Sequence, residues 1–171
     1  MRTKTINIYK FSELPEDSKR KALEKFKQGY DYAWTGEWQD TRREFERRFP
    51  VKVRDYSIGA FNHSYARTEY TADEDIFGHA IVEYMNNCHK ALLASPDTMT
   101  GYCGDYDILQ PILDFMKNPE DEKSLSELLK ECVDSWVDGY QKDMEFQLSD
   151  EYQIDHIESN EYEFTEDGEL A

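Results

Sequence analysis

Residues 124–148 carry the longest uninterrupted helical pattern in the chain. Their apolar and acidic side chains recur at helical spacing and fall on opposite faces of the helix that they predict. Ser124 and Glu127 have the spacing of a capping box at its start. The apolar face consists of Leu125, Leu128, Leu129, Cys132, Val133, Trp136, Val137, Tyr140 and Met144. Because so wide an apolar face must be covered by other parts of the chain, we expect this helix to be a core element.

The opposite face of the same predicted helix is acidic. At 100° per residue, five carboxylates fall within an arc of about 60° and span about 27 Å. Their mean spacing of about 5–7 Å is comparable with the phosphate ladder of a nucleic-acid strand. These five residues are Glu127, Glu131, Asp134, Asp138 and Glu145. The simpler interpretation is a solvated helix face, and the functional one is a carboxylate array that docks into a basic, nucleic-acid-binding groove of another protein.

The charge of the chain is unevenly distributed. The net charge is −17, and residues 1–54 hold 14 Lys/Arg against 9 Asp/Glu, whereas residues 55–171 hold 6 against 28. The acidic C-terminal segment 143–171 has eleven Asp/Glu and no Lys or Arg. Such a balance disfavours direct nucleic-acid binding by the whole surface. We therefore expect a partner protein with a basic surface, and we add three tail residues to the predicted interface, namely Asp150, Glu151 and Glu158.

Two predicted N-terminal helices carry most of the basic residues and support an alternative function. Their cations are Lys19, Lys21, Lys25, Lys27, Arg42, Arg43, Arg47 and Arg48. Lys and Arg in this density could contact phosphates. Acids are interleaved with them, which favours ion pairs along the helix surface instead. The alternative hypothesis is an antitoxin-like or regulatory module that contacts nucleic acid through these helices.

Strand and helix patterns follow one another along the rest of the chain. The predicted strands are Thr3–Phe11, Val51–Ile58, His63–Tyr70 and a last one around Tyr162 and Phe164, with a bulge between Val53 and Tyr56. The predicted helices begin at Pro15 and at about Glu37, and then cover Asp73–Leu93, Asp107–Lys117, Ser124–Leu148 and a short segment from Ser149. Together they predict an α+β fold. We expect one small antiparallel sheet of about three to four strands, covered by four to six helices, in a single compact domain of residues 1–171.

The two ends of the chain carry a family resemblance. Phe11-Ser12-Glu13-Leu14-Pro15-Glu16 begins the pattern F-S-E-L-P-E-x-x-K-x-K-A, and the chain closes with Tyr162-Glu163-Phe164-Thr165-Glu166-Asp167-Gly168-Glu169. Both segments resemble the corresponding ends of a family of small phage and prophage proteins of uncharacterised function, some of which are labelled antitoxins. The resemblance covers only these terminal segments. It implies a phage or prophage origin, and it implies no catalytic residues.

Catalytic and metal-binding patterns are weak in this sequence. Asp75, His79 and Glu83 stand at i, i+4 and i+8 and could begin a metal site, but no second cluster completes it, so we expect an ordinary polar helix face. Cys88 fits the apolar stripe of its predicted helix, and Cys103 is a loop residue that we expect to be exposed. Phosphate-binding glycine loops and the common hydrolase motifs are absent. We therefore predict no enzyme activity, no metal and no cofactor.

The cellular setting follows from three further observations. No apolar run approaches the roughly 20 residues that a membrane span needs, and the N-terminus lacks the apolar core of a signal peptide. The three cysteines lack CxxC spacing, which fits a reducing compartment. We expect a protein of the bacterial host cytoplasm, and the sequence leaves its oligomeric state open, with a dimer as one option. The predicted function is that of a non-enzymatic phage or prophage protein that binds and inhibits a host nucleic-acid-handling or defence protein, through a DNA-mimicking carboxylate surface.

Overall fold

The computed structural model describes residues 7–171 and confirms the α+β class. In this part of the chain there are seven α-helices and four strands. Contacts divide the protein into two compact units, which are described separately below. Unit 1 comprises residues up to Tyr32 together with 144–171, and unit 2 comprises residues 33–143. The single-domain expectation stays a prediction.

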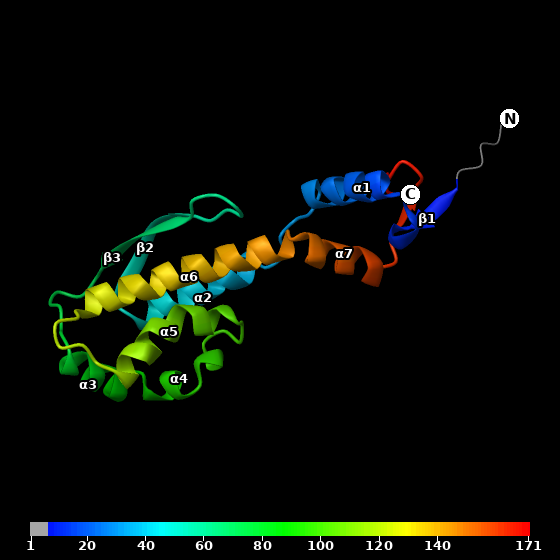
Figure 1. Ribbon diagram of the computed structural model, residues 1–171. Helices are drawn as coiled ribbons and strands as arrows, with labels where there is room; N and C mark the ends of the chain where they lie inside the picture. The colour runs from blue at the N-terminus through cyan, green and yellow to red at the C-terminus, as the bar shows by residue number, and fades with distance from the viewer. Residues whose placement is uncertain (1–6) are drawn as a thin grey trace. The chain divides into compact units, whose positions relative to one another are not determined.

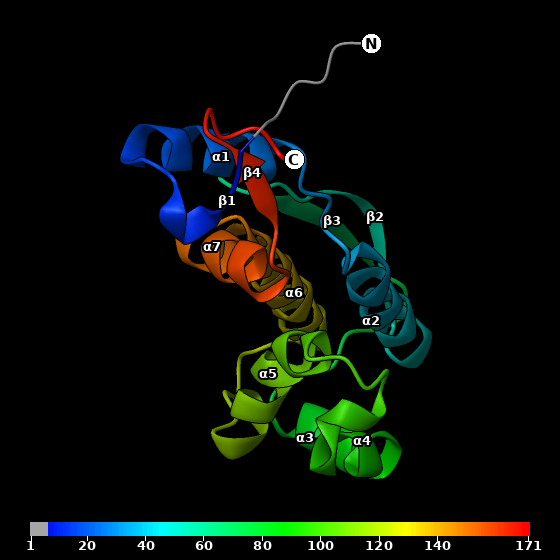
Figure 2. The same cartoon turned by 90° about the vertical axis from the view of Figure 1, so that its right-hand side faces the viewer.

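Unit 1 is built from both ends of the chain. Its elements are β1 (Ile8–Lys10), a 3-10 turn (Phe11–Glu13), α1 (Glu16–Gln28), α7 (Asp150–Ser159) and β4 (Glu163–Thr165). β1 and β4 pair antiparallel, with Ile8 opposite Thr165 and Lys10 opposite Glu163. Figure 2 shows this strand pair next to α1 and α7. Residues 3–6 of the predicted first strand lie outside the described residues.

A small aromatic and aliphatic core holds unit 1 together. Phe11, Leu14 and Ala22 from the N-terminal segment pack with Ile157 and Phe164 from the C-terminal segment. The rings of Phe11 and Phe164 meet edge to face, with their centroids 6.0 Å apart. Side chains of this size gain roughly 1.5–3 kcal/mol each on full burial. Because the core draws on both segments, neither can bury its apolar residues alone.

Unit 2 contains the hairpin and most of the helices. Its elements are α2 (Thr35–Arg48), β2 (Val51–Ser57), β3 (Tyr65–Tyr70), α3 (His79–Cys88), α4 (Lys90–Ala94), α5 (Gly104–Lys117) and α6 (Leu125–Gln147), whose last four residues count with unit 1. β2 and β3 pair antiparallel, and a register shift between Val53 and Asp55 confirms the predicted bulge. The described strands form two two-stranded sheets instead of the expected single sheet. The reason is that the terminal strands pair within unit 1, whereas the hairpin belongs to unit 2.

Helix α6 is the central core element of unit 2, as its apolar face predicted. Leu129, Cys132, Val133 and Trp136 on this face are fully buried. The Trp136 indole N–H donates to the Trp38 carbonyl on α2 at 2.8 Å. On another side the Tyr56 ring of β2 packs edge to face on Trp136, with centroids 5.3 Å apart. Figure 1 shows α6 running beside α2 and α5, with the hairpin alongside.

The prediction of one helix over residues 73–93 is wrong in two respects. Residues 73–78 are not helical, and the rest forms two helices, α3 and α4. The segment before His79 pairs with the start of α6 instead, because Leu125 N–H donates to the Ile76 carbonyl at 2.8 Å and Gly78 N–H donates to the Lys123 carbonyl at 3.1 Å. Gly78 has a φ of +49°, which a helix cannot accommodate. The helix then breaks again at His89. Tertiary hydrogen bonds therefore override the local helical pattern here.

Two further details differ from the expected pattern. Helix α5 begins at Gly104, three residues before the predicted start at Asp107, so Pro111 lies in the interior of the helix. Cys88 is exposed instead of lying in the apolar stripe of its helix, and Cys103 is exposed as predicted. Cys88 points outward because of the orientation of α3. Ile81 and Met85 are buried, and the next inward position, four residues on, is His89.

Candidate functional site

The exposed face of α6 in unit 2 carries four of the predicted interface acids. Glu127, Glu131 and Asp138 are exposed, and Asp134 is half-exposed. Their outward direction follows from the buried apolar face on the other side of the helix. Along the axis, the 11 residue steps from Glu127 to Asp138 rise about 16 Å, which is about 5.5 Å between successive carboxylates. The predicted stripe is thus present as a row on the helix surface.

Each of these four carboxylates has a different local environment. Glu127 accepts hydrogen bonds from the Ser124 backbone N–H at 3.1 Å and from its hydroxyl, while Glu127 N–H donates to the Ser124 hydroxyl, which confirms the capping box. Glu131 forms an ion pair with Lys123, and Asp134 forms one with Lys130 at 2.5 Å. The side chain of Asp138 has no ion pair or hydrogen bond with any residue of 7–171.

The loop before α6 brings more acids to the same surface. A shallow hollow of about 540 Å³ is lined by Glu120, Glu122, Lys123, Glu127, Lys130, Glu131 and Asp134. Five carboxylates thus face two ammonium groups. Hydrogen bonding to Glu131 raises the pKa of Lys123, against the opposing effect of burial. Glu120 and Glu122 were not among the predicted interface residues, and the acidic run that precedes Ser124 was the signal that could have found them.

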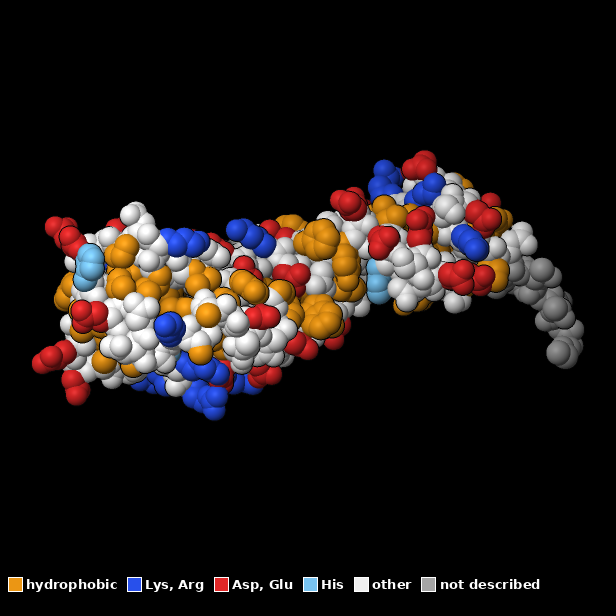
Figure 3. Space-filling model, turned by 90° about the horizontal axis from the view of Figure 1, so that it is seen from below, with side chains coloured by type: hydrophobic (Ala, Val, Ile, Leu, Met, Phe, Trp, Pro, Cys, Tyr) orange, Lys and Arg blue, Asp and Glu red, His pale blue; other side chains and the backbone are white. Residues whose placement is uncertain are grey.

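The other four predicted acids belong to unit 1. Glu145 is half-buried near the end of α6. Asp150 forms an ion pair with Lys27 of α1, which leaves Glu151 and Glu158 of α7 as exposed carboxylates without an ion pair in the described part of the chain. On the face of unit 1 drawn in Figure 3, acidic side chains are spread over the surface with basic ones among them. The eight predicted residues are therefore divided equally between the two units.

The cations of α1 and α2, which carry the alternative hypothesis, are largely paired with acids. The ion pairs are Lys19–Glu16, Arg20–Asp17, Lys25–Glu169, Lys27–Asp150, Arg42–Glu46, Arg43–Asp40, Arg47–Glu44 and Arg48–Glu44. The hydrogen bond from Arg47 lowers the pKa of Glu44, although burial acts in the opposite direction. The interleaving of acids therefore has the effect that the sequence predicted. Phosphate groups would have to compete with these carboxylates for every cation of the two helices except Lys21, which has no ion pair within residues 7–171.

The possible metal cluster of Asp75, His79 and Glu83 is not formed as a helix face. Asp75 precedes α3, and its carboxylate accepts from the backbone N–H groups of Ile76 and Ser126 at 3.0 and 3.1 Å. His79 Nδ1 lies 3.2 Å from Asp121 instead. Among residues 7–171, no group of three His, Cys, Asp or Glu side chains is placed to hold a metal ion. Asp75 has a structural role at the start of α6.

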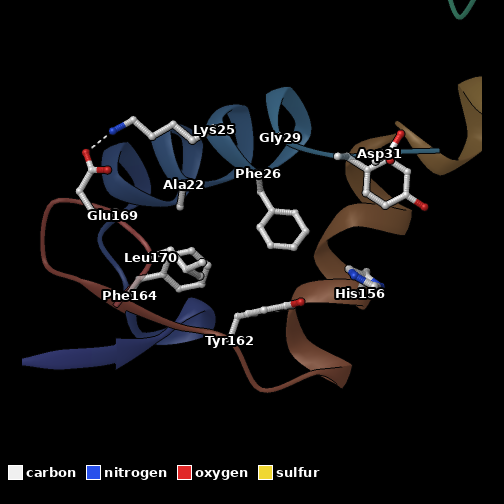
Figure 4. A pocket seen from close by; sticks show the side chains of 12 residues that line it. Ala22, Lys25, Phe26, Gly29, Asp31, His156, Tyr162, Phe164, Glu169 and Leu170 are labelled. Atoms are coloured by element: carbon white, nitrogen blue, oxygen red, sulfur yellow. Dashed lines mark hydrogen bonds and ion pairs between the residues drawn. The ribbon is translucent and has the colours of Figure 1, made fainter. Parts of the chain in front are cut away.

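A pocket in unit 1 was not predicted from the sequence. It has a volume of about 440 Å³ and is drawn in Figure 4. It is lined by Ala22, Lys25, Phe26, Gly29, Tyr30, Asp31, His156, Tyr162, Phe164, Gly168, Glu169 and Leu170. Phe26 points from α1 into the pocket, and the side chain of Tyr162 extends below it toward His156 of α7. Because the lining comes from segments more than 120 residues apart, no local pattern could have indicated it.

Comparison with protein-family models, with curated proteins and with solved structures finds no match. The resemblance of the two terminal segments to phage and prophage proteins stays a prediction. None of the helices in residues 7–171 is long and apolar enough to cross a membrane.

Proposed function

We propose that this chain is a non-enzymatic phage or prophage protein that binds and inhibits a host protein with a basic, nucleic-acid-handling surface. The observation that carries the proposal is the excess of carboxylates on the exposed surface of α6 and its preceding loop. Five acids there face two lysines, and Asp138 adds a carboxylate without a partner in residues 7–171. A positive groove meeting this surface would gain complementary charges along the helix.

Ion pairs within the protein support this function over nucleic-acid contact by α1 and α2. All cations of those helices except Lys21 form ion pairs with acids, whereas the acids of α6 outnumber the cations near them. Exposed ion pairs contribute only about 0–1 kcal/mol, so Glu131 and Asp134 can exchange Lys123 and Lys130 for cations of a partner at little cost. We assign the leading contacts to Glu131, Asp134 and Asp138, with Glu127 keeping its capping role.

The test compares two triple variants as affinity baits in a bacterial lysate. Glu131→Gln, Asp134→Asn and Asp138→Asn remove three charges from α6 and leave the capping box intact. Asp73→Asn, Glu83→Gln and Asp97→Asn remove three exposed charges elsewhere on unit 2. We expect the first bait to capture its partner between about threefold and a hundredfold less well, because each lost pair is worth roughly 0.2–1 kcal/mol. The matched control bait should capture it like the wild type.

Salt and DNA supply the complementary measurements. The captured protein should elute as ionic strength rises, since exposed charges are screened. The purified chain should not retard DNA in a gel at physiological salt. Undiminished capture by the α6 variant would sink the role assigned to this helix, and a DNA shift that disappears on changing Arg43 and Arg47 to Gln would favour the alternative function.

A further inference from the structure

The pocket of unit 1 has aromatic walls. The rings of Phe26 and Tyr162 meet edge to face at 5.1 Å, and the His156 ring lies 5.8 Å from Phe26 and 6.2 Å from Tyr30. Phe26, Tyr30 and Tyr162 are only half-buried, so parts of their rings remain open to the pocket. Aromatic rings have electron-rich faces that attract cations, particularly planar guanidinium groups.

The charged groups of the pocket lie at its two ends. Lys25 and Glu169 form an ion pair at one end, and Asp31 lies at the other (Figure 4). Asp31 is exposed and has no ion pair or hydrogen bond through its side chain in the described part of the chain. This end also follows the last residue of α1, Gln28, with Gly29 and Tyr30 between. The carboxyl end of a helix carries a partial negative charge, which adds to that of Asp31.

We propose that this pocket binds an arginine side chain of a partner protein. The aliphatic part of the side chain lies against Phe26 and Tyr162, and the guanidinium group reaches Asp31 beside the Tyr30 ring. A volume of about 440 Å³ is within the range of ligand pockets and accommodates the side chain with its neighbouring backbone. Arginine is preferred to lysine because its planar group both stacks on rings and pairs with a carboxylate through two hydrogen bonds.

This site is independent of the acidic surface of α6. It shares with the proposed function only the basic character of the partner. Its lining comes from α1, residues 29–31 that follow this helix, α7 and the C-terminal segment. Capture of a host protein through α6 could therefore fail while the pocket binds arginine, and the reverse also holds. A direct titration with small peptides separates the two.

The experiment uses the full chain and three tripeptides with blocked ends, Gly-Arg-Gly, Gly-citrulline-Gly and Gly-Leu-Gly. Citrulline has nearly the shape of arginine without its charge. Aromatic ¹H–¹³C NMR signals of Phe26, Tyr30 and Tyr162 report occupancy as each peptide is titrated into the millimolar range. We expect the arginine peptide to shift these signals with an affinity several-fold higher than that of the other two peptides, and to bind more weakly as salt is added.

Variants test the contributions of charge and ring separately. Asp31→Asn should weaken binding of the arginine peptide by about threefold, as loss of one exposed charge pair would. Phe26→Leu removes part of the ring that packs on the aliphatic part of the arginine side chain, and it should also weaken binding by about threefold. Asp155→Asn removes the same charge from an exposed position of α7 outside the pocket lining and should leave binding unchanged. Because Asp31 is exposed, Asp31→Asn should not affect folding, and it therefore still tests the proposal if Phe26→Leu weakens the fold.

Several results would overturn the proposal. Equal binding of the leucine or citrulline peptide would identify an apolar site without a preference for cations. Unaltered arginine binding by Asp31→Asn would remove the role of that carboxylate, and unshifted ring signals with every peptide would show that the pocket does not take an arginine side chain.

Discussion

Trp38 packs against two glycines that come from different helices. A Cβ atom on Gly104 of α5 would lie 2.9 Å from the Trp38 ring, and one on Gly139 of α6 would lie 3.0 Å from it and 2.7 Å from the Asp107 carboxyl carbon. The ring also stacks on Tyr140, with centroids 5.3 Å apart and planes within 3°. The absence of side chains at both glycines lets α2, α5 and α6 approach one another around this indole.

A Gly139→Ala substitution should therefore destabilise the protein. Overpacking of a core costs typically about 1–3 kcal/mol, and the gain in helix propensity of about 1 kcal/mol offsets part of it, so we expect a net loss of up to about 2 kcal/mol in the free energy of unfolding. Gly36 in α2 has open space around it and is the matched control. Urea unfolding should show no loss for Gly36→Ala, and an equal effect of the two substitutions would contradict the packing argument.

His89 occupies an inward position of unit 2 between two aromatic rings. Its ring lies 4.3 Å from that of Phe49, and Nε2 lies 3.1 Å from the Tyr84 hydroxyl. Burial, with the nearby Arg48 charge, lowers the pKa of His89 below its ordinary value of 6.5. The folded chain therefore binds this proton less readily than the unfolded chain.

Stability should consequently fall as the pH drops below about 6.5, because the unfolded state then takes up a proton that the folded state resists. The slope contributed by one proton is at most about 1.4 kcal/mol per pH unit. Urea unfolding between pH 7.5 and 5.5 tests this prediction. The free energy of unfolding of His89→Gln should depend less on pH than that of the wild type, whereas His63→Gln, at an exposed position, should show the pH dependence of the wild type. Parallel curves for wild type and His89→Gln would refute this origin of the acid sensitivity.

Among the elements, α6 is specified at its start both by a local capping pattern and by hydrogen bonds to a distant segment of the chain. Ser124 caps its first turn, and the same turn receives the segment 76–78 through backbone hydrogen bonds. The capping box is therefore also the place where the chain before α3 is attached. By contrast, α3 begins late because Gly78 and Ile76 use their hydrogen-bonding groups in this attachment.

Removing the cap should weaken α6 by a predictable amount. Ser124→Ala loses the oxygen that accepts from Glu127 N–H at 3.1 Å, and such losses typically cost about 1 kcal/mol. Ser135→Ala, in the middle of the same helix, removes a hydroxyl without a hydrogen bond in the described residues and should be neutral or slightly stabilising. Chemical unfolding of both variants checks the difference, and equal stabilities would argue against the cap.

At the scale of the whole molecule, each unit has its own core and its own excess of acids. Unit 1 contains 8 Lys/Arg and 15 Asp/Glu, giving −7, and unit 2 contains 12 and 22, giving −10. The two sum to the net charge of −17. The acidic character is thus a property of both units, although the C-terminal segment contains no cations of its own and draws on Lys25 and Lys27 of α1.

Deleting residues 148–171 should unfold the N-terminal segment of unit 1 and spare unit 2. Phe11, Leu14 and Ala22 would lose Ile157 and Phe164, which complete their core. Hydrogen exchange should show α1 amides without protection and α6 amides near Trp136 still protected. Phe164→Ala, expected to cost about 3–5 kcal/mol by truncating the same core, should give a milder loss confined to unit 1. Protected α1 amides in the truncated chain would disprove this dependence.

Local patterns in the sequence were sufficient to predict the α+β class, both faces of α6, the bulged hairpin and the capping box. These features depend on residues within a few positions of one another, where spacing and geometry are linked directly. The prediction of one helix over residues 73–93 failed because its first residues form hydrogen bonds with a segment about 50 residues away. Cys88 is exposed because α3 buries Ile81 and Met85 instead.

Which charges are neutralised and which side chains form a pocket depend on the tertiary structure. Lys25 and Lys27 pair with acids more than 120 residues away, and the walls around Phe26 come from α1, α7 and the C-terminal segment. The acidic face of α6 and the strongly acidic character of the chain, by contrast, follow from the sequence alone. Periodicity specifies the direction of a side chain on its own element, whereas ion pairs and cavities depend on what the fold places opposite it.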